Sequence, residues 1–131
     1  MSHSPRLLRV EHAQLAMPAG KEAEARRFYS GVLGLAEVAK PAELAARGGC
    51  WFEQGEGEGA IKLHLGVEPE FRPARKAHVA FVVDTLDPLL AAARDAGCEV
   101  TEPEHLAPYR RAFVFDPFGN RLELMEMEAS R

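Results

Sequence analysis

Two stretches of this chain, one in each half, correspond residue by residue. The run from His12 to Met17 matches the run from His78 to Val83, 66 residues later. The stretch beginning at Gly34 is matched in the same way by the stretch beginning at Gly97. An internal repeat indicates a structure built from two copies of one supersecondary unit, each of which needs the other or a helix layer to cover its apolar face.

Each unit has the same predicted order: strand, helix, strand, strand, strand. Alternation of polar and apolar residues predicts the strands, and apolar residues spaced three or four apart predict the helices. In the first unit we expect strands at 8–17, 35–39, 49–54 and 60–67, a helix over 21–33, and a helical turn or loop at 41–49. In the second we expect strands at 76–84, 98–101, 109–116 and 121–127, a helix over 86–96, and a loop at 102–108.

The predicted fold class is therefore α+β, with two βαβββ modules forming a curved mixed-sheet cup and helices outside. We expect one domain over residues 1–131, with module one at about 7–67, a linker at 68–75 and module two at about 76–127. A chain of 131 residues is long enough for one well-packed core.

Composition narrows the function classes. A net charge of −4 without a recurring basic patch predicts no nucleic-acid partner. There is no apolar run long enough to span a membrane and no apolar signal core near the N-terminus. Cys50 and Cys98 are far apart in apolar runs and are expected to be reduced and buried. Together these features predict a cytoplasmic protein.

Four titratable residues occupy corresponding places in the repeat. His12 and His78 lie in the first strand of each unit, and His64 and Glu123 lie in the last strand of each unit. The opposite face of each of these strands is apolar, so we expect the four side chains to share the inner face of the cup. Imidazoles and a carboxylate converging there are ligands for a divalent metal, with positions left open for water or substrate.

Each of these residues also has a structural interpretation. A single strand histidine is commonly a hydrogen-bonded structural residue, and Glu123 by itself would most often be a solvated carboxylate. His64 and Lys62 lie on the same strand face, so either could occupy the fourth corner of the site. Lys62 and Arg121 are also candidates for binding an anionic substrate, although surface solvation explains such side chains equally well.

Four sequence stretches resemble the vicinal oxygen chelate superfamily, which includes glyoxalase I, bleomycin-resistance proteins, fosfomycin-resistance enzymes, methylmalonyl-CoA epimerase and extradiol dioxygenases. The matching stretches are residues 11–15, 28–35, 77–81 and 116–124, and the resemblance extends over about residues 7–127. It implies paired βαβββ modules, usually in a homodimer, with metal ligands on the first and last strands.

Carried over by position, the resemblance implies that His12, His78 and Glu123 hold a divalent ion such as Zn, Ni, Mn or Fe. Glyoxalase I and the epimerase take a fourth ligand, often Glu or Gln, from the last strand of module one. This chain has Lys62 and His64 there, which makes ordinary glyoxalase I activity doubtful. His64 could ligate the metal or act as a general base.

The leading hypothesis is a metal-dependent, glyoxalase-like lyase, isomerase or transferase that acts on a small substrate chelated through adjacent oxygens. One alternative is an antibiotic-type binding protein that uses the same cup without chemistry. Another is an iron-dependent ring-cleaving dioxygenase, because two histidines and one carboxylate form a facial triad. The best-known extradiol dioxygenases have more modules and longer chains, so this short chain fits that branch less well.

Overall fold

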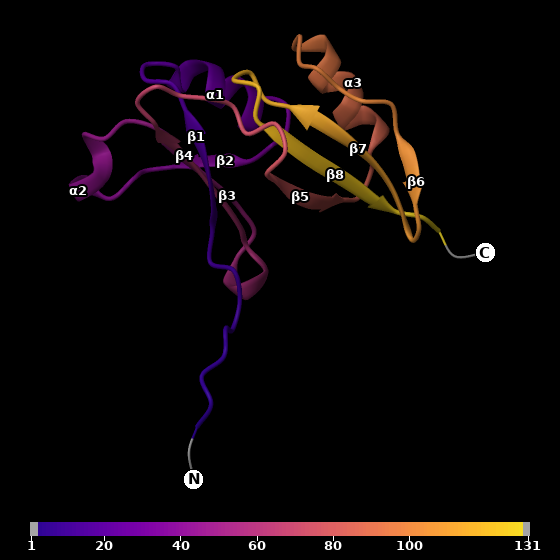
Figure 1. The fold of residues 1–131 in the computed structure, drawn as a ribbon, viewed down its shortest axis with the longest axis horizontal. Coiled ribbons are helices and arrows are strands. Elements are labelled where there is room, and N and C mark those ends of the chain that lie inside the picture. The colour runs from indigo at the N-terminus through magenta and orange to yellow at the C-terminus, as the bar shows by residue number, and fades with distance from the viewer. Residues whose placement is uncertain (1–2, 130–131) are drawn as a thin grey trace.

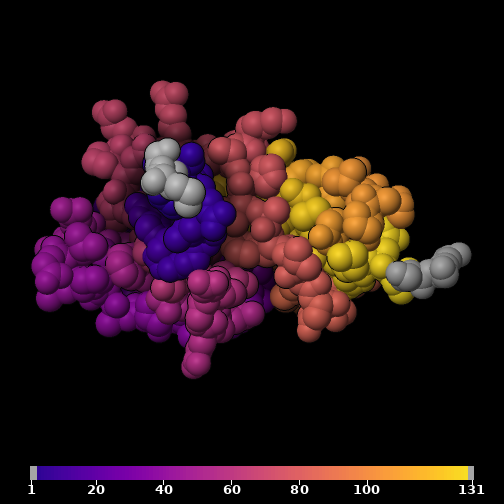
Figure 2. Space-filling view, turned by 90° about the horizontal axis from the view of Figure 1, so that it is seen from below, coloured from indigo at the N-terminus to yellow at the C-terminus, as the bar shows by residue number. Residues whose placement is uncertain are grey.

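The computed structural model describes residues 3–129, so the first two and last two residues of the predicted single domain lie outside it. The chain forms two four-stranded mixed sheets, one from each half of the sequence, which lie side by side (Figures 1 and 2). Short helices accompany each sheet. The predicted α+β class with two modules is thus confirmed.

The first sheet has the strand order β1-β4-β3-β2. β1 runs parallel to β4, and the other neighbours are antiparallel. The elements of this half are β1 (Ala13–Met17), α1 (Glu22–Tyr29), β2 (Ala36–Val38), α2 (Ala42–Ala45), β3 (Cys50–Gln54), the 3-10 turn η1 (Gly57–Gly59) and β4 (Ile61–Val67).

The second sheet repeats this topology in the order β5-β8-β7-β6, again with one parallel pair between the first and last strands. Its elements are β5 (His78–Val83), α3 (Asp87–Asp95), β6 (Glu104–Leu106), β7 (Tyr109–Phe115) and β8 (Arg121–Met127). β1 and β5 each have a neighbour on one side only, so each sheet ends in a free edge made by its first strand.

One face of each sheet carries the core. The middle of β4 places Leu63 and Leu65 on this face, and β8 places Leu122 and Leu124 there; all four leucines are completely or almost completely buried. Phe28 of α1 and Leu90 of α3 pack into the same apolar cluster, which runs through both halves of the chain. The alternating residues of the strands therefore leave their polar side chains on the opposite faces, as the sequence predicts.

A buried polar network joins the two halves. The Tyr29 hydroxyl in α1 donates a 2.6 Å hydrogen bond to Asp116, which precedes β8. Asp116 also accepts bonds from Asn120, and the Asn120 side chain donates to the Ala16 carbonyl of β1 at 2.8 Å. Gly119 lies in the turn between Asp116 and Asn120 with φ of +92°, a conformation that glycine adopts at no steric cost. The network fixes the turn from which β8 starts.

Two strand predictions need correction. The strand expected at 8–17 begins only at Ala13. Among the described residues no strand pairs with the backbone before Ala13, although β4 starts two residues ahead of Leu63, the partner of Ala13 (Figure 1). The strand expected at 98–101 is wrong: that segment makes a single bridge between Val100 and Val114, and Pro103 has no N–H with which to extend it. The fourth strand of this sheet is β6, which lies within the predicted loop at 102–108.

No helix within residues 3–129 is both long enough and apolar enough to cross a membrane. Both cysteines are free thiols, as predicted; Cys50 is buried and Cys98 is partly buried. Burial raises the pKa of the Cys50 thiol to about 11, which keeps it protonated near neutral pH.

Candidate metal centre

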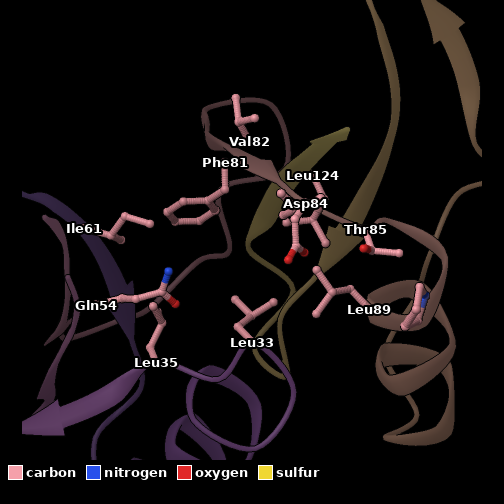
Figure 3. Close-up of a pocket in the computed structure, with 12 residues that line it drawn as sticks. Leu33, Leu35, Gln54, Ile61, Phe81, Val82, Asp84, Thr85, Leu89 and Leu124 are labelled. Carbon is pink, nitrogen blue, oxygen red and sulfur yellow. The ribbon is translucent and has the colours of Figure 1, made fainter. Parts of the chain in front are cut away.

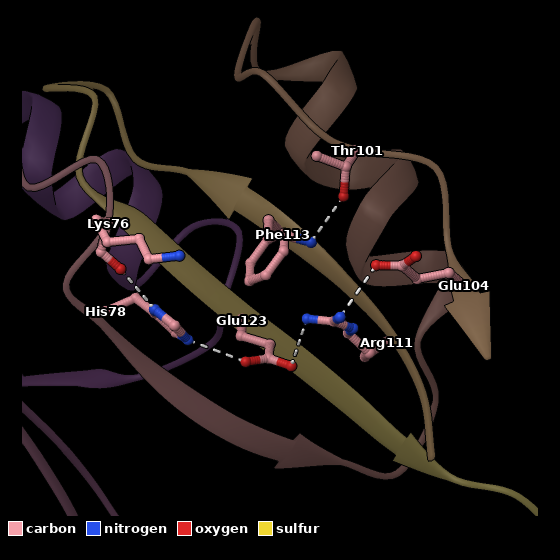
Figure 4. Close-up of polar contacts among 7 residues, drawn as sticks. All are labelled: Lys76, His78, Thr101, Glu104, Arg111, Phe113 and Glu123. Atoms are coloured by element: carbon pink, nitrogen blue, oxygen red, sulfur yellow. Dashed lines mark hydrogen bonds and ion pairs between the residues drawn. The ribbon is translucent and has the colours of Figure 1, made fainter. Parts of the chain in front are cut away.

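The polar face of the second sheet carries a histidine–carboxylate pair. His78 Nε2 lies 3.0 Å from Glu123 Oε1, and the side chains come from the neighbouring strands β5 and β8 (Figure 4). Arg111 of β7 lies 3.3 Å from the other oxygen of Glu123 and 3.1 Å from Glu104 (Figure 4). Glu123 is buried, and its two carboxylate oxygens contact His78 on one side and Arg111 on the other.

The second nitrogen of His78 decides what this pair can bind. Nδ1 lies 2.9 Å from the Lys76 carbonyl oxygen, which can only accept a hydrogen bond, so Nδ1 carries a proton. In neutral His78, the lone pair of Nε2 then faces the Glu123 carboxylate. Two acceptors at 3.0 Å require a cation between or beside them, either a proton or a metal ion.

This arrangement fits a metal. Histidine ligands commonly donate their other N–H to a backbone carbonyl, as His78 does. The two ligand atoms of a tetrahedral ion with bonds of about 2.0–2.1 Å lie about 3.3 Å apart, close to the observed spacing. The spacing of the two atoms and the second hydrogen bond of His78 therefore meet what two ligands of one divalent ion require.

On the first sheet, the corresponding position is occupied by a stack of three rings. His64 lies flat against Trp51, with ring centroids 3.8 Å apart, and His12 covers its other face at 4.3 Å. His64 is only 5% exposed, whereas His12 is exposed. Burial, followed by the charge of His12, holds the pKa of His64 below its usual value, so its imidazole is neutral near pH 7.

The four predicted ligands therefore form two pairs, one on each sheet. Among residues 3–129, no three His, Cys, Asp or Glu side chains are grouped closely enough to hold a metal ion. His12 lies beside His64, and His78 lies beside Glu123. The assignment of these four residues as ligands stays a prediction, and one copy of the chain does not bring them together.

The two candidate substrate residues differ in their surroundings. Lys62 forms an ion pair with Glu11 at 2.8 Å, so its charge already has a partner. Arg121 makes no side-chain hydrogen bond or ion pair within the described part of the chain. Its guanidinium stacks on Phe113 at 4.3 Å, and its buried Nε atom lacks a partner. Arg121 pairs in register with His78, so it lies beside the histidine–carboxylate pair.

Three residues around these pairs were not singled out from the sequence: Trp51, Arg111 and Phe113. The repeat marked positions on the first and last strands of each unit only, whereas these residues lie on β3 and β7. Register explains their placement, because Trp51 pairs with His64 and Phe113 pairs with Glu123. The period-two pattern of β7 would have placed Arg111 and Phe113 on one face, but their partners required the strand alignment.

Comparison with known families agrees with this architecture. Residues 9–124 match the model of the Glyoxalase/Bleomycin resistance protein/Dioxygenase superfamily. The chain belongs to this superfamily. The superfamily model covers both sheets, from the approach to β1 through most of β8, so the resemblance on the four sequence stretches is confirmed.

Solved structures share the superfamily fold with the chain. A glyoxalase family protein from Bacillus anthracis is 41% identical, with a TM-score of 0.84, over 96% of this chain and 100% of that one. A genomically encoded fosfomycin resistance protein from Listeria monocytogenes is 12% identical, with a TM-score of 0.70, over 92% and 94% of the two chains. An antibiotic binding protein from Streptomyces sp. CB03234 is 21% identical, with a TM-score of 0.66, over 94% and 100%. No curated protein matches the chain.

Proposed function

We propose that this chain is a metal-dependent, glyoxalase-like enzyme that acts on a small substrate chelated through adjacent oxygens. The observation that carries this proposal is the His78–Glu123 pair, in which Nδ1 lies 2.9 Å from the Lys76 carbonyl oxygen and Nε2 lies 3.0 Å from a buried carboxylate. The pair is suited to a divalent ion such as Zn, Ni, Mn or Fe.

We further propose that the site is completed in a homodimer. His12 and His64 lie on the sheet of module one, and His78 and Glu123 lie on the sheet of module two. The two sheets of one copy share no strand pairing, so the module-one sheet of one copy can join the module-two sheet of a second copy. A site with His12, His78 and Glu123 as ligands then forms twice per dimer.

A bound divalent ion would supply Lewis acidity to the two substrate oxygens. The protein's own residues would orient the ligands, accept a proton and bind the charged part of the substrate. Arg111 holds Glu123 through one oxygen and leaves the other facing His78. Neutral His64 either completes the ligand set or accepts a proton from the substrate. Arg121, with no acidic partner among the described residues, is placed to bind an anionic group of the substrate beside His78.

The ring stack supports a second candidate function. The exposed imidazole of His12, backed by His64 and Trp51, is an aromatic surface on which a planar ligand can stack. Such a surface suits a protein that sequesters a small molecule without chemistry. The Streptomyces structural neighbour is named an antibiotic binding protein.

Metal analysis separates these functions. We expect about one equivalent of divalent metal per chain, a rise in Tm on adding the ion, and loss of both in His78→Ala and Glu123→Ala. Iron with oxygen-dependent turnover of a catechol would favour the dioxygenase alternative. If the protein holds less than about 0.2 equivalents and no ion raises its Tm, both enzyme hypotheses fail and sequestration becomes the better explanation.

A further inference from the structure

The polar face of the second sheet becomes apolar toward the end of β8. On this strand the residues that share the face are, in chain order, Arg121, Glu123, Met125 and Met127. Arg121 and Glu123 belong to the candidate site, and the two methionines continue the same face beyond it. Alternate residues of a strand lie about 6.6 Å apart, so the methionines directly follow the histidine–carboxylate pair.

The neighbouring strands extend this apolar end. Strand pairing places Val82 of β5 beside Met125, and Tyr109 of β7 beside Met127. Leu106 of β6 pairs with Tyr109 and completes the row. These five residues form an apolar patch, which we call the methionine patch. Val82, Met127 and Leu106 are 62%, 55% and 48% exposed. Contiguous exposed apolar side chains of this kind mark an interaction site.

The two ends of the face differ in charge. Arg111 borders the methionine patch beside Met125, but its charge is balanced by Glu104 at 3.1 Å and by Glu123 at 3.3 Å (Figure 4). Arg121, at the other end, has no acidic partner among residues 3–129. One end of the face therefore attracts an anionic group and the other end an apolar group, with His78 and Glu123 between them.

The apolar cavity between the modules lies on the other side of this sheet. Its volume is about 510 Å³, and it is lined by residues of both modules (Figure 3). Phe81 and Leu124, which line it, lie on the faces of β5 and β8 opposite to His78 and Glu123. A ligand held by this pair could enter the cavity only around the edge of β5, whereas the methionine patch lies on the pair's own face.

We propose that the methionine patch binds an apolar tail of the substrate whose adjacent oxygens are held at His78 and Glu123. The inference rests on the proposed function and names its substrate class, an amphiphilic small molecule with a chelating polar end and an apolar tail. An anionic group of the substrate points toward Arg121, and the tail runs from Met125 to Met127. The unbranched thioether side chains of methionine adapt to tails of different shape.

Alkyl hydroxamic acids test this inference, because their two adjacent oxygens chelate a divalent ion while the alkyl chain varies. On the zinc-loaded protein, octanohydroxamate should bind at least about thirtyfold more tightly than acetohydroxamate in calorimetry, since each additional half-buried methylene improves binding roughly twofold. Met127→Gln/Leu106→Gln should weaken octanohydroxamate binding at least about tenfold and change acetohydroxamate binding less than about twofold. Both side chains are about half exposed, so the fold should persist by circular dichroism.

The methionine methyl groups report where the tail lies. In NMR spectra of protein with isotope-labelled methionine methyl groups, octanohydroxamate should shift the signals of Met125 and Met127, whereas acetohydroxamate should leave Met127 unchanged. Met17 is the matched control, because it is completely buried in the core and its signal should stay in place with either ligand. Equal shifts of Met17 and Met127 would overturn the proposal.

The outcomes separate this inference from the metal proposal. If the two hydroxamates bind equally, or if the double variant keeps the preference for octanohydroxamate, the patch does not bind the tail. A double variant that keeps this preference but sediments differently would show that the patch is a contact between copies. If acetohydroxamate does not bind, the metal proposal fails; octanohydroxamate shifts of Met125 and Met127 in metal-free protein would then retain the tail site, and their absence would reject it as well.

Discussion

Tyr29→Phe should weaken the junction between the two modules. The Tyr29 hydroxyl is completely buried and donates a 2.6 Å hydrogen bond to Asp116 Oδ2, which is itself buried. Hydrogen bonds to charged groups contribute about 1.5–3 kcal/mol, and the Asn120 amide still donates to the same oxygen at 3.1 Å. We therefore expect the free energy of unfolding to fall by about 2 kcal/mol, which lowers Tm by roughly 6–10 °C in a chain of this size.

The loss should depend on pH. Burial raises the pKa of Asp116 above its ordinary 3.8, and the bond from Tyr29 counteracts this rise. The folded protein therefore binds this proton more tightly than the unfolded chain, so stability falls as pH rises from 3.8 through the folded pKa. Removing the Tyr29 donor raises the folded pKa further. The difference between wild type and variant should thus be larger at pH 8 than at pH 4.

Urea unfolding at both pH values measures this difference. Tyr109→Phe is the matched control, because Tyr109 is the only other tyrosine and its hydroxyl makes no hydrogen bond among the described residues. We expect the control to change stability by less than about 0.5 kcal/mol. A Tyr29→Phe loss no larger than that of the control, or one that is equal at pH 4 and pH 8, would refute this account of the network.

Two further pairs of variants test the site and the first sheet. Arg121→Gln should weaken binding of inorganic phosphate to the metal-loaded protein at least about tenfold by calorimetry, whereas Lys62→Gln, whose charge is paired with Glu11, should change it less than about twofold; equal effects would remove the distinction between these residues. Gly49→Ala should cost at least roughly 2 kcal/mol more than Gly34→Ala in chemical unfolding, although both glycines have positive φ. A Cβ at Gly49 would lie 2.1 Å from the Leu65 carbonyl oxygen, whereas one at Gly34 would meet nothing within 4 Å; similar costs would show that backbone conformation alone matters.

The sequence by itself determined the modules and their faces. Period two and the repeat are local properties, so they identified the strand cores, the buried leucines of β4 and β8, and the polar positions at His64 and Glu123. The same repeat supported the superfamily resemblance, which the comparison confirms. The predicted positions of the short strands were less accurate, because the position of β6 is fixed by its hairpin with β7 rather than by its own composition.

Tertiary structure decided which residues meet. The alternation over 8–17 is uniform, yet among the described residues only Ala13–Met17 has a strand partner, at positions 63–67 of β4. Pairing also decided that His12 lies with His64 and His78 with Glu123, on separate sheets. A repeat shows that two positions are equivalent. It does not show whether they meet in one copy or across two, because edge pairing depends on the strand that is available rather than on the strand's own sequence.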